Sequence, residues 1–249
     1  MYHFYTERSN ILEDHIVLDG PDVNHIRNVL RMKDGEELII CDGEGTDHYC
    51  RIRCNKGRKL IADIVKSCGS AAEPSAGIVL FQGLPKKDKM ELIIQKSVEL
   101  GVKLIVPVMT KRVIVKTGSD EKGARKLERW QSIAKSAAEQ SGRGIIPEVH
   151  ETVSFETALK MASELECSLI PYENADNSDA GMEEARNIIR SLRGKKSIGV
   201  FIGPEGGFEP EEAERAIDSG CKAISLGRRI LRTETAGLAA LAIIGFELD

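Results

Sequence analysis

Two glycine-rich loops near the carboxyl end are the part of the chain best suited to hold a ligand. The first follows the apolar run Ser197–Ile202, which has the pattern of a buried parallel strand, and contains three glycines within Gly203–Gly207. Glycines without a Cβ let the backbone approach a ligand closely. The second follows the run Ala223–Leu226, begins at Gly227 and continues through Arg228–Arg232. Loops at the carboxyl ends of neighbouring parallel strands form ligand crevices, so we expect a binding site here.

The residues after the first loop constrain the charge of that ligand. Pro210 suits the first position of a helix, and four glutamates surround it: Glu209, Glu211, Glu212 and Glu214. These carboxylates complement the helix dipole and would repel phosphate, the usual ligand of a glycine loop at a helix start. A neutral or cationic ligand fits better, and S-adenosylmethionine, with a positive sulfonium, is one. An ordinary strand–turn–helix with dipole-matched glutamates explains the same pattern without a ligand.

Longer stretches of the chain resemble a known family. The carboxyl-terminal motifs are GPEGGF (Gly203–Phe208), PEE (Pro210–Glu212) and LGRRILRTETA (Leu226–Ala236). Matching segments upstream are His25–Gly35, Lys89, Gln95–Val102, Pro107, Arg112, Glu128–Trp130, Ala137–Arg143 and Pro147. Together they resemble the bacterial RsmE-type enzymes of the SPOUT superfamily, which methylate N3 of a uridine in 16S ribosomal RNA of the small ribosomal subunit. Glu209 departs from the family, where a serine-like cap is commoner.

The resemblance implies an α/β protein with two domains. Residues 1–72 are expected to form a small PUA-like or OB-like β-barrel that binds RNA. Residues 73–249 are expected to form a SPOUT methyltransferase domain with a parallel sheet and a trefoil knot, a feature too rare for any local signal to predict. The last helix contains many small residues between Glu234 and Phe246, and in the family this region helps to form a homodimer. A helix buried inside one protomer is the alternative.

The resemblance and the charge pattern also name candidate site residues. Those expected to contact S-adenosylmethionine are Pro171, Ile202, Gly203, Pro204, Glu205, Gly206, Leu226, Gly227, Ile230, Leu231, Thr233 and Ala236. Those expected to contact small-subunit ribosomal RNA are Arg27, Arg31, Arg51, Arg53, Arg58, Lys89, Arg112 and Arg143. The catalytic candidates are Arg232, Arg229 and Glu234.

Methylation of uracil N3 explains the choice of catalytic candidates. N3 carries a proton that must be lost as the atom attacks a methyl group, so the site needs proximity, a cation near the developing charge and a route for the proton. Arg229 and Arg232 can stabilise the uracil oxygens or hold phosphate, and Arg228 matches the motif less well. Glu234 is the candidate base, although a carboxylate in the first turn of a helix more often serves the dipole. No nucleophilic cysteine is required.

Composition fits a globular chain in a reducing compartment. The chain has 249 residues, of which 41% are hydrophobic, and no apolar run approaches the ~20 residues of a membrane span. The start, Met1–Asn10, lacks the pattern of a signal peptide. Cys50 and Cys54 have no second pair that would complete a zinc site. We therefore expect reduced thiols, a cytoplasmic location and no metal.

The net charge of −4 conceals an asymmetry along the chain. Residues 86–143 contain fourteen basic and seven acidic side chains, whereas residues 144–249 contain eleven basic and nineteen acidic ones. A local basic excess is what neutralisation of RNA phosphates requires. A solvated face on a helix over Glu121–Gln140 explains part of the excess, but Lys86–Lys89 and Lys111–Lys116 lie outside that helix.

Short strands are predicted for the amino-terminal part, which suggests a small barrel. We expect one helix over Pro21–Met32, and Ser67–Gly77 has the small, polar composition of a linker. The expected strands are Glu37–Cys41, Asp47–Cys54 and Lys59–Val65. Between residues 51 and 66 there are six basic side chains and one acidic side chain, that of Asp63. The basic residues are Arg51, Arg53, Lys56, Arg58, Lys59 and Lys66.

The remainder alternates between strands and helices, which predicts a parallel sheet flanked by helices. The expected strands are Ile78–Gln82, Leu104–Val108, Cys167–Pro171, Ile198–Ile202 and Ala223–Leu226. The expected helices are Lys89–Leu100, Glu121–Gln140, Phe155–Glu164, Met182–Leu192, Glu211–Ser219 and Thr235–Phe246.

Two other functions stay open on the sequence alone. One is a different SPOUT enzyme, which methylates transfer RNA or a ribose hydroxyl. The other is a non-enzymatic RNA-binding assembly factor, although the intact glycines of both loops argue against a decayed cofactor site. Binding of S-adenosylmethionine in the absence of RNA, measured by calorimetry, distinguishes an enzyme from such a factor.

Overall fold

The computed structural model describes residues 1–55, 57–86, 89–112, 120–172 and 178–248. The chain forms two compact units. The amino-terminal unit consists of Met1–Glu73 and Ala138–Ile146, and the carboxyl-terminal unit consists of Pro74–Ala137 and Pro147–Asp249. Ala138–Ile146, which the sequence assigned to the second domain, thus packs with the first unit; the domain boundary at residue 72 stays a prediction.

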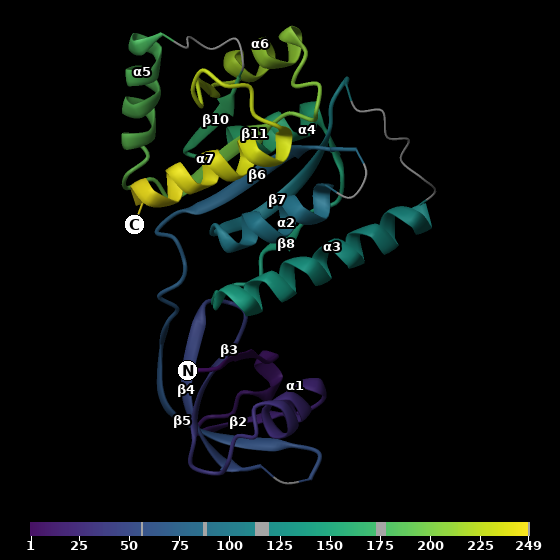
Figure 1. Cartoon of the computed structure of the whole chain (residues 1–249), viewed down its shortest axis with the longest axis vertical. Coiled ribbons are helices and arrows are strands. Elements are labelled where there is room, and N and C mark those ends of the chain that lie inside the picture. Colours follow the sequence, from purple (N-terminus) through teal and green to yellow (C-terminus); the bar gives the residue numbers. More distant parts are fainter. Residues whose placement is uncertain (56, 87–88, 113–119, 173–177, 249) are drawn as a thin grey trace. The chain divides into compact units, whose positions relative to one another are not determined.

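The amino-terminal unit is a five-stranded sheet in the order β1-β3-β4-β5-β2, which curls around its own core (Figure 1). Its strands are β1 (His3–Tyr5), β2 (His15–Leu18), β3 (Glu37–Cys41), β4 (Thr46–Cys54) and β5 (Leu60–Gly69). The β1–β3 pair is parallel and the other three pairs are antiparallel. The side chains of Ile16, Leu38, Ile40 and Leu60 are fully buried in this core. A short 3-10 turn, η1 (Arg8–Asn10), joins β1 to β2.

The single helix expected over Pro21–Met32 is wrong in its length and type. The structure has a short α1 (Pro21–Asn24) followed by a π-helical turn, η2 (His25–Val29). Val29, at the end of this turn, is 64% exposed, whereas Val23 and Ile26 are buried in the core. Arg31 then takes a positive φ of 56°, which ends the helical segment.

The expected linker over Ser67–Gly77 begins too early. The first three of its residues belong to β5 and pair with Thr46–His48 of β4. Cross-strand hydrogen bonds therefore hold a segment whose small, polar composition indicated a loop. The strands β1 and β2 are short, at three and four residues, and no sequence pattern predicted them.

The carboxyl-terminal unit contains a sheet of seven strands, all paired in parallel, with the order β12-β10-β11-β6-β7-β8 and with β9 also on β7. The strands are β6 (Gly77–Gly83), β7 (Val102–Met109), β8 (Glu148–Val149), β9 (Val153–Ser154), β10 (Cys167–Pro171), β11 (Ser197–Ile202) and β12 (Lys222–Ile224). The predicted parallel sheet is confirmed, with the last strand ending two residues earlier than expected. The two-residue strands β8 and β9 were not predicted.

All six expected helices are present. They are α2 (Lys89–Glu99), α3 (Asp120–Ser141), α4 (Phe155–Ser163), α5 (Asp179–Arg190), α6 (Pro210–Asp218) and α7 (Thr233–Leu248). In the carboxyl-terminal unit, α4 and α6 pack on one face of the sheet, and α2 and α7 lie side by side against it (Figure 1). No helix within the described ranges is both long enough and apolar enough to span a bilayer. The trefoil knot stays a prediction.

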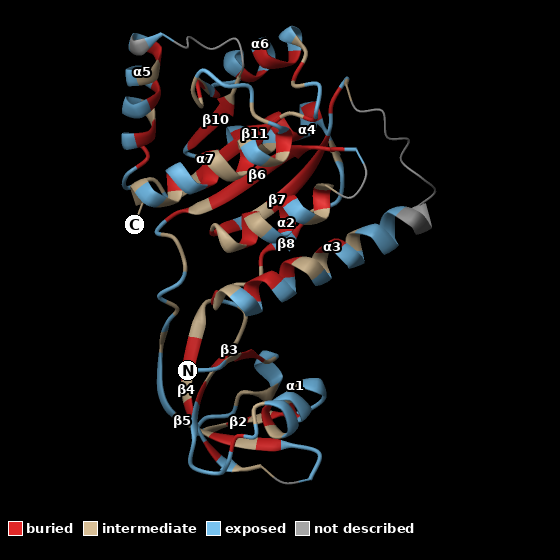
Figure 2. Ribbon diagram, viewed as in Figure 1, coloured by how far each residue is buried: buried red, intermediate tan, exposed pale blue. Residues whose placement is uncertain are grey.

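Burial on both faces explains the continuous apolar runs of the central strands (Figure 2). Along β6, Val79 and Phe81 join the core under α4 and α6, while Ile78 and Leu80 are fully buried as well. The ring of Phe81 stacks on that of Phe201 in β11, with centroids 4.5 Å apart. The two strands are thereby fixed beside each other next to the glycine loops.

The strand order determines where the two glycine loops meet. The loops follow β11 and β12, which both border β10 and do not pair with each other. The end of β10 at Pro171 therefore lies between the loops and must contribute to any crevice there.

Candidate functional site

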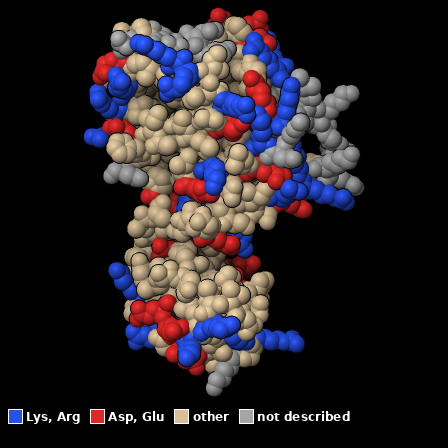
Figure 3. Space-filling model, viewed as in Figure 1, with Lys and Arg blue, Asp and Glu red and all other residues tan. Residues whose placement is uncertain are grey.

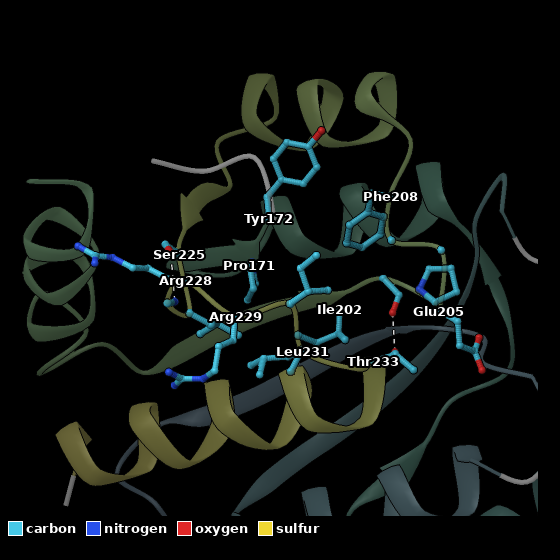
Figure 4. Close-up of a pocket in the computed structure, with 18 residues that line it drawn as sticks. Pro171, Tyr172, Ile202, Glu205, Phe208, Ser225, Arg228, Arg229, Leu231 and Thr233 are labelled. Atoms are coloured by element: carbon cyan, nitrogen blue, oxygen red, sulfur yellow. Dashed lines mark hydrogen bonds between the residues drawn. The ribbon is translucent and has the colours of Figure 1, made fainter. Parts of the chain in front are cut away.

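A cavity opens where β10, β11 and β12 end, and both glycine loops line it (Figure 4). Its walls are built from the segments Ile202–Phe208 and Ser225–Leu231, together with Pro171, Tyr172, Thr233 and Ala236. The wall combines apolar side chains and glycines with the polar side chains of Glu205, Arg228 and Arg229. Such a cavity at the carboxyl edge of a parallel sheet is the expected place for a ligand.

The glycines of the first loop are required by its backbone path. A Cβ on Gly203 would lie 3.0 Å from backbone atoms of Gly207 and 3.1 Å from the backbone nitrogen of Phe208. Gly207 itself has a φ of +70° and its N–H donates to the carbonyl of Pro204 at 2.9 Å. The loop therefore folds back tightly on itself, which only glycine permits at these positions.

A buried hydrogen-bond relay joins the two sides of the cavity. The hydroxyl of Thr233, the first residue of α7, donates to the carbonyl of Gly203 at 2.6 Å and accepts from Nε2 of Gln82 at 3.0 Å. Gln82 lies in β6, is fully buried, and also donates to the carbonyl of Gly83 at 2.9 Å. The relay thus fixes the first loop against both α7 and the sheet.

Carboxylates occupy the amino end of α6, which begins at Pro210 as expected. Glu212 is 2% exposed, and its two oxygens accept from the N–H of Glu209 at 3.0 Å and the N–H of Lys111 at 2.8 Å. Glu209 in turn accepts from Nε of Arg112 at 2.7 Å. Negative charge therefore already lies at this helix start and would repel a phosphate.

A second ion-pair cluster lies at the start of α7. The Lys89 amine is 3.2 Å from a Glu234 oxygen and 3.4 Å from a Glu205 oxygen. A backbone hydrogen bond and then Lys89 hold the pKa of Glu234 below its usual value. Burial opposes ionisation of Glu205, but backbone hydrogen bonds, including one from Lys86, and the Lys89 amine outweigh it and lower that pKa. Both carboxyls are ionised at neutral pH.

The cavity contains every residue that the sequence assigned to a cofactor. All twelve, from Pro171 to Ala236, line its walls, although their contact with a cofactor stays a prediction. The catalytic candidate Arg229 also lines it, whereas Arg232, the last residue of the second loop, is exposed and does not line it, and Glu234 pairs with Lys89.

Sequence reasoning missed five of the lining residues: Tyr172, Gly207, Phe208, Ser225 and Arg228, the last of which was set aside as a weaker match to the motif. Gly207 and Phe208 belong to the GPEGGF motif, so the motif could have predicted that they line the site. Tyr172 follows β10, and the rule that ligands bind at strand ends would have found it once the strand order was known. Ser225 accepts the N–H of Gly227 at 3.1 Å, a turn that no motif indicated.

The candidate RNA-binding residues of the amino-terminal unit are mostly paired with neighbours. Arg51 pairs with Glu37 at 2.8 Å, and Arg53 pairs with Asp14 and Asp63. Arg27 donates to the Asn55 amide oxygen at 2.9 Å and to the Gly57 carbonyl. The side chains of Arg31 and Arg58 are exposed.

Arg143 differs from the other candidates because it is only 2% exposed. Its guanidinium lies on the Glu73 carboxylate, with Nη2 to Oε2 at 2.5 Å, and Glu73 also accepts the N–H groups of Gly144 and Ile145. A contact between this arginine and RNA would require the pair to open. Among the basic residues counted above, Lys56, Lys87 and Lys116 lie outside the described residues.

Replacing Thr233 tests whether the relay stabilises the carboxyl-terminal unit. Thr233→Val keeps the shape of the side chain but leaves the half-buried Gly203 carbonyl without this donor and Nε2 of the buried Gln82 without this acceptor, so we expect the free energy of unfolding to fall by about 1–3 kcal/mol. Thr233→Ser retains the hydroxyl and should recover most of the loss. Urea unfolding followed by circular dichroism measures both, and equal stabilities of the Val and Ser variants would contradict the role of the hydroxyl.

Comparison with known proteins agrees with the site. The RNA methyltransferase domain family matches residues 72–245, and the RNA methyltransferase PUA domain family matches residues 18–60. Ribosomal RNA small subunit methyltransferase E of Bacillus subtilis is 36% identical over 93% of this chain and 90% of its own length. The enzyme of the same name from Mesomycoplasma hyopneumoniae is 32% identical over 97% of both chains.

A solved structure extends the likeness to the whole fold. The crystal structure of ribosomal RNA small subunit methyltransferase E from Neisseria gonorrhoeae, bound to S-adenosyl methionine, superposes with a TM-score of 0.78. It is 36% identical and covers 97% of this chain and 95% of its own. By sequence over nearly its full length, this chain belongs to the ribosomal RNA small subunit methyltransferase E family.

Proposed function

We propose that this protein transfers the methyl group of S-adenosylmethionine to N3 of one uridine in 16S ribosomal RNA of the small subunit. The observation that carries the proposal is the cavity between the two glycine loops, built from the residues of the GPEGGF and LGRRILRTETA motifs. Family membership supports the reaction class, and the Neisseria gonorrhoeae relative was solved with S-adenosyl methionine. The choice of ribosomal over transfer RNA follows the names of the relatives.

The chemistry of the cavity fits S-adenosylmethionine better than a nucleotide phosphate. Pro171, Ile202 and Leu231 offer apolar surface to an adenine ring, and Gly203 and Gly227 allow close backbone approach. The carboxylates of Glu209, Glu211 and Glu212 lie at the amino end of α6, and their negative charge would repel a phosphate there. The cofactor, when bound, supplies an activated methyl group on its sulfonium.

The chain itself must stabilise charge on the uracil. As N3 loses its proton, O2 and O4 gain negative charge, and a guanidinium can donate a fork of hydrogen bonds to such oxygens. Arg229 lines the cavity, and Arg232 lies at the end of the same loop with an exposed side chain. We assign Arg232 the main catalytic role, with Arg229 beside it.

Glu234 is the remaining candidate for the proton. Its carboxylate is ionised, as an acceptor must be, but its lowered pKa weakens it as a base. The pair with Lys89 at 3.2 Å also occupies one of its oxygens. We therefore rank Glu234 below the arginines among the catalytic residues.

RNA recognition is assigned chiefly to the amino-terminal unit, which matches a PUA domain. The side chains of Arg31, Arg51, Arg53 and Arg58 are exposed there, and exposed ion pairs exchange readily for phosphate because they are weak. The positive charge that RNA binding requires is thus available at the surface of this unit.

We further propose a cytoplasmic homodimer. Ile230 and Phe246 are each 88% exposed and Ile243 is 46% exposed, and the last two lie on α7, which is apolar on all sides. Large apolar side chains at this exposure favour contact with a second copy. All six cysteines are free thiols, as a reducing compartment would keep them.

The first test concerns cofactor binding by the glycine loop. Gly203→Ala places a Cβ against the Gly207 backbone, and Gly206→Val places a branched side chain against Arg112, so both should displace the loop and weaken S-adenosylmethionine binding at least ~10-fold in calorimetry. Gly123→Ala, in open space on α3, is the matched control and should bind normally. A folded Gly203→Ala variant with unchanged affinity would remove the loop from the site.

The second test concerns RNA binding. Affinity for small-subunit ribosomal RNA should fall steeply with salt because bound phosphates release counterions. Neutralising Arg51, Arg53 and Arg58 together should reduce the slope of log affinity against log salt by about 2 and leave S-adenosylmethionine affinity unchanged. A salt-independent affinity in the wild type would contradict electrostatic binding.

The third test concerns catalysis by Arg232. Arg232→Lys keeps the charge but loses the planar fork, and loss of one such donor costs about 10²–10³ in rate. Single-turnover methylation at saturating RNA should show this drop while cofactor affinity changes little. If Arg232→Lys and Arg232→Ala both reach the wild-type rate at saturating RNA, the arginine only binds RNA.

A further inference from the structure

Residues from the basic segment 86–143 contact residues from the acidic segment 144–249 inside the carboxyl-terminal unit. Lys111 and Arg112 lie just after β7, and both contact the glutamates at the start of α6. Lys89, at the start of α2, engages Glu205 and Glu234. On the face shown in Figure 3, basic and acidic side chains lie close together rather than in separate patches.

Arg112 makes the most specific of these contacts. Its Nε and Nη2 lie 2.7 Å and 3.1 Å from the two carboxylate oxygens of Glu209, and its Nη1 donates to the carbonyl of Gly206. A Cβ added to Gly206 would meet the Arg112 side chain at 3.1 Å, so the aliphatic part of the arginine packs on the glycine. Arg112 lies just after β7, and β7 and β10 are on opposite sides of β11 in the sheet. The arginine therefore contacts the first glycine loop from the side opposite β10.

We propose that Arg112 is a positioning residue of the first glycine loop, and that its fork on Glu209 and Gly206 holds the loop in the conformation that binds S-adenosylmethionine. The inference rests on the proposed function, because it concerns the same site. It differs from the RNA-binding role that the charge pattern suggested for this residue.

The geometry favours positioning over phosphate binding. All three guanidinium nitrogens of Arg112 are engaged by the loop and the helix start, and bidentate arginine–carboxylate pairs are among the stronger hydrogen-bonded contacts in proteins. Glu209 carries a pKa lowered chiefly by this arginine, so the pair is fully ionised at neutral pH. A phosphate would have to displace Glu209 to reach the fork.

The effect on affinity follows from the population of the competent loop. Where a binding-competent conformation is only partly populated, the apparent dissociation constant rises in inverse proportion to that fraction. A loop with three glycines in five residues has many alternative conformations once its outer contacts are removed. We therefore expect Arg112→Ala to weaken S-adenosylmethionine binding about tenfold, measured by calorimetry without RNA.

Three further variants separate positioning from loss of charge or of the fold. Arg112→Lys keeps the charge without the fork and should bind nearly as weakly as Arg112→Ala. Glu209→Ser retains a helix-capping oxygen but removes the carboxylate, so it should weaken cofactor binding on its own and add little in the double variant with Arg112→Ala. Arg129→Ala removes an arginine of the same basic segment that pairs with Glu91 at 2.8 Å, away from the loops, and should bind normally.

Hydrogen exchange on the cofactor-free full chain gives a readout that does not depend on the proposed function. Amides of residues 203–209 should exchange faster in Arg112→Ala and in Glu209→Ser than in the wild type or Arg129→Ala. If the wild type fails to bind S-adenosylmethionine yet this difference appears, the proposed function is wrong and the loop contact is real. Unchanged exchange and unchanged cofactor affinity in folded Arg112→Ala, with or without weaker RNA binding, would overturn the positioning role.

Discussion

The hydrogen bond that the Thr233 hydroxyl donates to the Gly203 carbonyl, with an oxygen–oxygen distance of 2.6 Å, is the contact on which the rest of the site depends. It joins the start of the first glycine loop to the start of α7, and α7 begins where the second glycine loop ends. Buried Gln82 completes the relay by donating to the same hydroxyl from β6. Because both loops are anchored at one point of the sheet, their main chains can face each other across the end of β10. Four of the residues that line the cavity are glycines, so the conformation of the loops, and with it the shape of the cavity, depends on such anchors.

Ion pairs at the first turns of α6 and α7 also help to hold the two loops in place. The first turn of α6 and the first turn of α7 both carry glutamates, and each cluster is met by basic residues from the ends of β7 and the start of α2. These pairs are partly exposed, so their value lies less in overall stability than in the orientation of the loops they hold. The same glutamates would repel a phosphate at both helix starts, which agrees with a cationic cofactor rather than a nucleotide.

The sequence was informative where local chemistry decides the structure. Strands with continuous apolar runs, a helix with a proline at its first position and glycine loops at strand ends could be predicted directly, whereas the twelve lining residues came from the resemblance of these loops to a known family. Contacts between residues far apart in the sequence could not be predicted from local patterns. Gln82 and Thr233 are 151 positions apart, and Arg112 and Glu209 are 97 apart, so counting charge along the chain suggested RNA where the fold shows an ion pair. The π-helical turn at His25–Val29 and the short strands β1, β2, β8 and β9 were missed because their patterns are too short to carry a period.

Mass mapping of small-subunit ribosomal RNA tests the central claim most directly. RNA from cells that lack this protein is compared with RNA from cells that contain it, and both are digested to fragments whose masses report methyl groups. The account predicts one uridine that carries a methyl on N3 in the presence of the protein and is unmodified in its absence, with the mark restored by the purified protein and S-adenosylmethionine. Identical fragment masses in the two samples, or a methyl on a ribose or on another base, would contradict it.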